Sequence, residues 1–101
     1  MLIYNTTYHT ENDAIASEFV AWLKSEYIPR ATKSGQLTLP QLAKVMASNQ
    51  EGQSFALQFH VHSLDALEAW YRATGAALVD SMAHDFGQKV VGFSTLMELL
   101  D

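Results

Sequence analysis

Large apolar residues alternate with polar or small ones along residues 55–62. A repeat of two residues is typical of a β-strand that is buried on one face only. The apolar set is Phe55, Leu57, Phe59 and Val61, and the polar or small set is Ala56, Gln58, His60 and His62. We therefore expect the apolar set to point into a core and the polar set to occupy the opposite face of the same sheet.

A strand followed by an amphipathic helix is expected before this segment. Residues 2–9 are rich in aromatic and β-branched side chains, which favour a strand. Thr10 and Asp13 form a start similar to a capping box, and apolar residues then recur at helical spacing. Pro29 lacks a backbone donor, so it should kink or end this helix near Ile28, with a further turn over Ala31 to Lys33 before Gly35 as the alternative.

The second half of the chain repeats this order. Residues 41–48 alternate weakly, and residues 49–52 supply a turn, so we expect an antiparallel hairpin with the strand that follows. Ser63 caps a second helix that ends near Gly87. Residues 88–100 then read as a last strand, rich in Val, Phe, Thr and Leu.

This order of strand, helix, strand, strand, helix and strand predicts a fold of the α+β class, a ferredoxin-like βαββαβ sandwich. We expect a single domain over residues 1–101, with a four-stranded antiparallel sheet and two helices on one face. Both alternating sets of the last strand are largely apolar, which is typical of burial on both faces. The face away from the helices is therefore expected to meet a second copy of the chain, as a homodimer.

Four segments resemble a small uncharacterised bacterial family of unknown function. They are Ile3-Tyr4-Asn5-Thr6-Thr7, Tyr27-Ile28-Pro29, the run from Ser54 to Phe59 that leads into Ser63-Leu64-Asp65-Ala66-Leu67, and Gly92-Phe93-Ser94-Thr95-Leu96. The resemblance covers nearly the whole chain and implies a ferredoxin-like, dimeric α+β barrel. It implies no activity, so we carry over no catalytic residue.

Composition narrows the classes of partner. The net charge is −5 with six lysines and arginines, which does not provide the basic surface that nucleic acid needs. The absence of cysteine excludes disulfides and thiolate catalysis. The first residues lead directly into a strand pattern, without a basic region or a long apolar segment. We therefore expect a cytoplasmic protein with no membrane span and no nucleic-acid partner.

The polar face of the sheet is the candidate ligand site. We expect the first and third strands to be central, adjacent and parallel, with Asn5 near Gln58, Thr7 near His60, and His9 near His62. Both helices would begin at the histidine end, where their free N–H groups and partial positive charge favour a carboxylate or phosphate. One hypothesis is therefore a small-molecule ligand, in particular an anion, held by these six residues.

The same six residues also have a purely structural interpretation. Polar side chains commonly line a wet interface, and Asn5 and Gln58 could satisfy each other in a cross-strand amide network. A metal site needs three or four converging ligands, and no spacing in the chain provides them. We therefore expect no metal and no cofactor.

Aromatic residues offer a second candidate region. Trp22 and Trp70 are expected to pack between the helices and the sheet. A functional alternative is that one of the four helix aromatics, with Tyr4 or Tyr8, lines a cavity there; the four are Trp22, Tyr27, Trp70 and Tyr71. In this alternative Arg30 would guard the entrance; a surface charge near the end of the first helix is the simpler interpretation.

Three functions are compatible with this fold. The first is a non-catalytic ligand-binding or interaction module, which we favour over an enzyme. The alternative is a monooxygenase-like enzyme of the dimeric barrel type, acting on a hydrophobic, aromatic or haem-like substrate. Haem-degrading monooxygenases of this fold combine a first-strand Asn, a second-helix Trp and a downstream His, to which Asn5 and Trp70 are superficially similar, whereas His84 lies too far along. An RNA-binding module would need Phe55 and Phe59 to face solvent.

Overall fold

The structure, a computed structural model, describes residues 1–47 and 51–101. Its strands are β1 (Leu2–Thr10), β2 (Leu37–Lys44), β3 (Gln53–Val61) and β4 (Val90–Glu98). Its helical segments are α1 (Asp13–Trp22), the π turn η1 (Leu23–Tyr27), α2 (Ile28–Thr32), α3 (Leu64–Trp70), the π turn η2 (Tyr71–Gly75), α4 (Ala76–Phe86) and the short 3-10 turn η3 (Gly87–Lys89). Ser48, Asn49 and Gln50, which belong to the predicted second strand and turn, lie outside the described residues.

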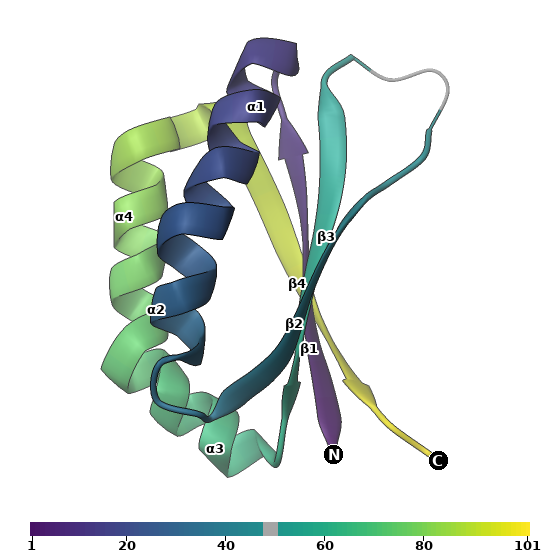
Figure 1. The fold of residues 1–101 in the computed structure, drawn as a ribbon, viewed down its shortest axis with the longest axis vertical. Coiled ribbons are helices and arrows are strands. Elements are labelled where there is room, and N and C mark those ends of the chain that lie inside the picture. Colours follow the sequence, from purple (N-terminus) through teal and green to yellow (C-terminus); the bar gives the residue numbers. More distant parts are fainter. Residues whose placement is uncertain (48–50) are drawn as a thin grey trace.

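The strands form one sheet in the order β2-β3-β1-β4, and every neighbouring pair is antiparallel. Helices α1 to α4 lie together on one side of this sheet, and no helix of the described residues lies on the other side (Figure 1). The predicted order of elements and their layering are therefore confirmed. We call the side without helices the open face.

The N-cap of the first helix lies two residues after the predicted cap, Thr10. This N-cap is Asn12, whose side-chain oxygen accepts a hydrogen bond from the backbone N–H of Ile15 at 2.9 Å. Thr10 is instead the buried last residue of β1, and its hydroxyl donates to the carbonyl of Gln53 at 2.8 Å. The predicted pairing of Thr10 with Asp13 is therefore wrong, because the sheet already uses the Thr10 hydroxyl.

Pro29 does not end the first helix. The turn before it is wider than an α turn, since the backbone N–H of Ile28 donates to the carbonyl of Leu23, five residues back. Pro29 thereby occupies one of the first positions of α2, where a missing N–H costs little. The helical segment continues to Thr32, so it does not end at Ile28, and the expected further turn before Gly35 is present.

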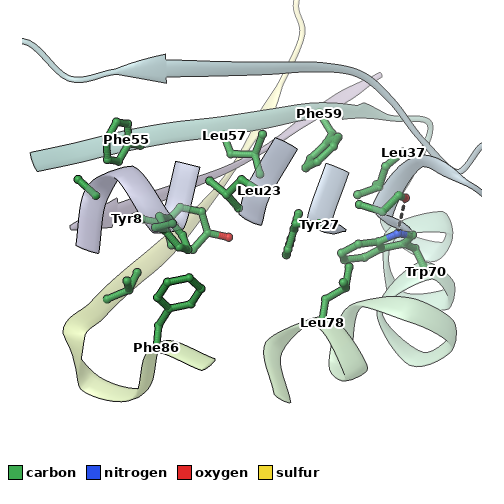
Figure 2. Close-up of a cluster of buried hydrophobic side chains, with 14 of the residues drawn as sticks. Tyr8, Leu23, Tyr27, Leu37, Phe55, Leu57, Phe59, Trp70, Leu78 and Phe86 are labelled. Carbon is green, nitrogen blue, oxygen red and sulfur yellow. Dashed lines mark hydrogen bonds between the residues drawn. The ribbon is translucent and has the colours of Figure 1, made fainter. Parts of the chain in front are cut away.

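The second helical segment is anchored by a tryptophan. Ser63 caps its start and Gly87, at a φ of +55°, follows its end, as predicted. Trp70 is fully buried, and its indole N–H donates to the carbonyl of Ala31 at 2.8 Å (Figure 2). This hydrogen bond joins α3 to α2. A Cβ at Gly75 would lie 2.6 Å from the Trp70 ring, so this helix needs glycine at that position.

The core lies between the helices and the sheet. The predicted apolar set of β3 faces the helices and is buried together with aromatic residues of β1, α1, η1 and α4 (Figure 2). Phe19 contacts Tyr8 and Phe86 edge to face, with ring centroids 5.0 and 5.3 Å apart. Phe55 and Phe59 are among the buried residues, so they cannot serve as exposed platforms for RNA bases.

Candidate functional site

The open face carries most of the predicted candidate residues. Alternation along the strands places Asn5, Thr7 and His9 of β1 on it, beside Gln58 and His60 of β3. His62 lies just beyond the end of β3 and is exposed. The division of β3 into a buried and an open set is therefore as predicted.

The predicted direction of β1 relative to β3 is wrong. The two strands are antiparallel, so Asn5 pairs with Gln58 as expected, but Thr7 pairs with Ala56 and His9 with Ser54. The reason is topological: the hairpin between β2 and β3 turns the chain back after the first crossover. His9 and His60 are consequently separated by six residues along the sheet, roughly 20 Å at about 3.3 Å per residue.

The same reversal separates the two helix N-termini. Helix α1 follows the end of β1 and helix α3 follows the end of β3. Because these two strands are antiparallel neighbours, the two helix starts lie at opposite ends of the strands. The partial positive charges of the two N-termini therefore cannot act on one anion. The geometry on which the anionic-ligand hypothesis depended is absent, although the six residues themselves remain an untested prediction as ligand contacts.

Three pairs of polar side chains on the open face are hydrogen-bonded to each other. Gln58 Nε2 donates to Gln41 Oε1 at 2.9 Å, and His9 Nδ1 lies 2.8 Å from Ser54 Oγ. Asn5 Nδ2 donates to its neighbour on the same strand, the hydroxyl oxygen of Thr7, at 3.2 Å. Among the described residues, no group of three His, Asp or Glu side chains gathers closely enough to hold a metal ion.

An apolar strip runs along the edge of the same face. Val91, Phe93 and Met97 of β4 point to the open face, where their side chains are 57%, 65% and 42% exposed. We call these three residues the β4 strip. We call the hydrogen-bonded polar side chains beside it, Asn5, Thr7, His9, Gln41, Ser54 and Gln58, the polar zone. Exposed apolar side chains gathered next to polar ones on one face are typical of a surface that another molecule covers.

A second region lies on the helix side of the sheet, between β1, β4 and α4. It is a hollow of about 240 Å³, into which hydroxyl-bearing residues from three elements converge. The hydroxyl residues are Tyr4, Thr6, Tyr8, Tyr27 and Ser94, and the other lining residues are Val79, Met82, Gly92 and Phe93. We call it the hydroxyl hollow, and none of its lining residues is charged.

Hydrogen bonds order these hydroxyls. The hydroxyls of Thr6 and Ser94 lie 2.9 Å apart, and Ser94 donates to the Tyr4 hydroxyl at 3.4 Å. Burial raises the pKa of Tyr8 to about 12, against the lowering effect of a hydrogen bond from Tyr27. Burial and the adjacent Tyr8 also raise the pKa of Tyr27. Both phenols are therefore neutral near pH 7, so they can donate or accept hydrogen bonds but cannot act as anionic bases.

The sequence indicated part of this hollow. A helix aromatic with Tyr4 or Tyr8 was the predicted combination, and Tyr27 meets both of them here. Thr6 and Ser94 were missed, because a short hydroxyl residue on a strand carries no spacing signal. Arg30 does not line the hollow.

Gly92 was the available clue to the position of Tyr8. A Cβ at Gly92 would lie 2.8 Å from the Tyr8 ring, and a glycine inside a strand commonly marks such a close approach.

The residue pattern of haem-degrading enzymes does not form one site in this chain. Asn5 lies on the open face, whereas Trp70 is buried on the helix side, so the sheet separates them. The side chain of His84 is 89% exposed and lies 3.0 Å from Asp85. These three residues therefore do not fit a haem pocket.

A family model matches residues 1–100 of the chain, described as a domain of unknown function (DUF4286). The chain belongs to the DUF4286 family. This bears out the resemblance seen in the sequence, and the family brings no activity with it. No curated protein matches this DUF4286 chain.

Solved structures confirm the ferredoxin-like fold. HapK from Hahella chejuensis superposes with a TM-score of 0.76 at 14% identity, over 99% of this chain and 93% of that chain. A dimeric ferredoxin-like protein from an uncultured marine organism gives a TM-score of 0.74 at 10% identity, over 99% and 94%. A mutant of MhuD, solved with two manganese protoporphyrin IX molecules bound per active site, gives 0.65 at 16% identity, over 100% and 96%. At these identities the likeness shows the fold alone.

No helix among the described residues combines the length and the apolar character that a membrane span requires.

Proposed function

We propose that the protein acts as a homodimeric α+β barrel whose open face is covered by the same face of a second copy, and that this dimer is a ligand-binding or interaction module. The exposed β4 strip carries the proposal. Its side chains would leave water on pairing, and burial of apolar surface contributes about 25 cal/mol per Å². A two-fold axis lets the strip of each copy meet the polar zone or the strip of the other.

The polar zone of the open face supports this pairing. Burying a polar side chain is costly when it loses its partner, but modest when the hydrogen bond already exists within the chain. The pairs Gln58–Gln41, His9–Ser54 and Asn5–Thr7 are formed before a second copy arrives. The solved dimeric ferredoxin-like protein of the same fold is a further argument, by analogy.

Light scattering coupled to size-exclusion chromatography tests the proposal. The chain of 11.2 kDa should elute with twice that mass. Val91→Asp should shift the mass toward one copy, because it places a charge in the covered strip. Val79→Asp is the matched control, since Val79 is 50% exposed but lies on α4, and its mass should stay dimeric. A wild-type chain with the mass of a single copy at every concentration would refute the dimer.

The monooxygenase alternative has less support. MhuD shares the fold, but the separation of Asn5 and Trp70 by the sheet removes the pattern that suggested the comparison. Titration with haem distinguishes the two functions. We expect no shift of the Soret band, and a saturable shift would favour the enzyme.

A further inference from the structure

We infer that the hydroxyl hollow is a binding site for a neutral aromatic molecule of one or two rings that carries a hydroxyl or carbonyl group. The inference does not depend on the dimer, because the hydroxyl residues and the α4 residues of the lining lie on the helix side of the sheet, and Phe93 is the one residue of the β4 strip among the lining residues. Its residues come from β1, η1, α4 and β4 of a single copy.

The lining of the hollow is rich in hydroxyl groups. Hydroxyl groups each offer one donor and two acceptor positions, and the five here are placed on three separate elements around one space. Ser94 donates to the Tyr4 hydroxyl and Tyr27 donates to Tyr8, while the hydroxyls of Thr6 and Ser94 lie 2.9 Å apart and either can be the donor. In this direction the hydroxyls of Tyr4 and Tyr8 are the last acceptors. Their own protons can therefore be donated to an oxygen of a bound molecule.

The residues that line the hollow carry no charge. Moving an ion into this hollow would remove its hydration without providing a partner of opposite charge. The phenols cannot supply that charge, because burial keeps both Tyr8 and Tyr27 protonated by raising the pKa of each. A neutral ligand is therefore favoured over a carboxylate or an amine.

The size of the hollow and its apolar side suit a small aromatic ligand. A volume of about 240 Å³ lies just below the usual range of small-molecule sites, about 300–1,000 Å³, and suits one or two rings. Val79 and Met82 of α4 form an apolar wall, and Val79 is half exposed in the free protein. A flat apolar body would cover Val79 while its oxygen reaches the hydroxyls.

An adjoining hollow sets the direction in which a ligand can extend. Tyr4 also lines a neighbouring hollow of about 360 Å³, together with Leu67 and Tyr71 and the charged residues Glu68 and Arg72. A longer aromatic molecule would therefore pass Tyr4 toward this second, mainly apolar space.

Three naphthalene probes test the inference on the wild-type protein at pH 7. They are 2-naphthol, unsubstituted naphthalene and 2-naphthoate, compared by fluorescence titration. We expect 2-naphthol to bind saturably and at least about tenfold more tightly than the other two, since one lacks the hydrogen-bonding group and the other is charged. Absence of saturable binding, or equal binding of naphthalene, would overturn the inference.

Variants locate the site. Tyr27→Phe and Ser94→Ala should each weaken 2-naphthol binding about fivefold or more while leaving naphthalene unchanged. The matched controls are Tyr71→Phe and Thr95→Val, whose hydroxyls lie outside the hollow, and their affinity should stay within about twofold. Equal effects in variants and controls would contradict the assignment. Circular dichroism checks that each variant is folded, and if one is not, the ranking of the three probes on the wild type still decides.

Discussion

The two faces of the sheet are built in different ways from the same alternating strands. On the helix side, Phe59 and Trp70 are almost fully buried within one chain. On the open face, Phe93 is 65% exposed, and the polar residues beside it are already paired with one another. The helix side is thus buried within a single copy, whereas the open face leaves apolar side chains exposed in a single copy, which is why we propose that a second copy covers it. Alternation in a strand therefore indicates that both faces have a role, but not which molecule covers each.

The largest effect should separate two phenylalanines on opposite faces. Phe59→Ala should lower the free energy of unfolding by about 3–5 kcal/mol, because it removes a buried ring from the core. Phe93→Ala should instead weaken the dimer, with a cost above about 1 kcal/mol if Phe93 is central to the interface. Urea denaturation at two protein concentrations measures both. The account is contradicted if Phe93→Ala lowers the free energy of unfolding as much as Phe59→Ala does, and by the same amount at both protein concentrations.

A smaller effect tests how closely the helix side is packed. Gly75→Ala should destabilise the protein by about 1–3 kcal/mol, because the added Cβ overlaps the Trp70 ring. Helix propensity alone predicts the opposite sign, since alanine is favoured over glycine by about 1 kcal/mol. Ala77→Gly at an exposed position of α4 is the control and should cost about that propensity value. A gain in thermal stability for Gly75→Ala would show that the ring has room.

A last effect, confined to high pH, is expected from the buried phenols. Between pH 10 and 12 the unfolded chain loses the Tyr8 proton while the folded chain keeps it, because the folded pKa is about 12 against an ordinary 10.0. Stability should therefore fall as pH rises through this window, by up to about 1.4 kcal/mol per pH unit from this group. Tyr8→Phe should reduce the slope, whereas Tyr71→Phe should not. Phenolate absorbance that rises for all four tyrosines near pH 10 would contradict this account.

The fold was predictable because periodicity records burial. The set from Phe55 to Val61, the cap at Ser63 and the stop at Gly87 each follow from one local interaction, and the structure has all three. The predictions were wrong where the outcome depends on a long-range contact or on a backbone geometry that the local pattern of residues does not encode. The Thr10 hydroxyl is used by Gln53, and the end of the first helix depends on a π turn that admits Pro29.

The candidate site was less predictable for the same reason. Asn5 meets Gln58 as expected, but the direction of β3 carries His60 and His62 away from His9. The hydroxyl hollow joins Thr6 to Ser94, 88 positions apart in the chain, and no local pattern links two such residues. Only the close approach of Gly92 to Tyr8 left a trace in the sequence.

The central claim is that a second copy covers the open face, and single-thiol labelling tests it most directly because the chain has no cysteine. Thr95→Cys places a thiol on the open face, and Ser34→Cys places one at an exposed position after α2. We predict that labelling at position 95 slows at least about tenfold as protein concentration rises, since only the dimer hides it. Labelling at position 34 should stay constant. Equal labelling rates at both positions at every concentration would contradict the account.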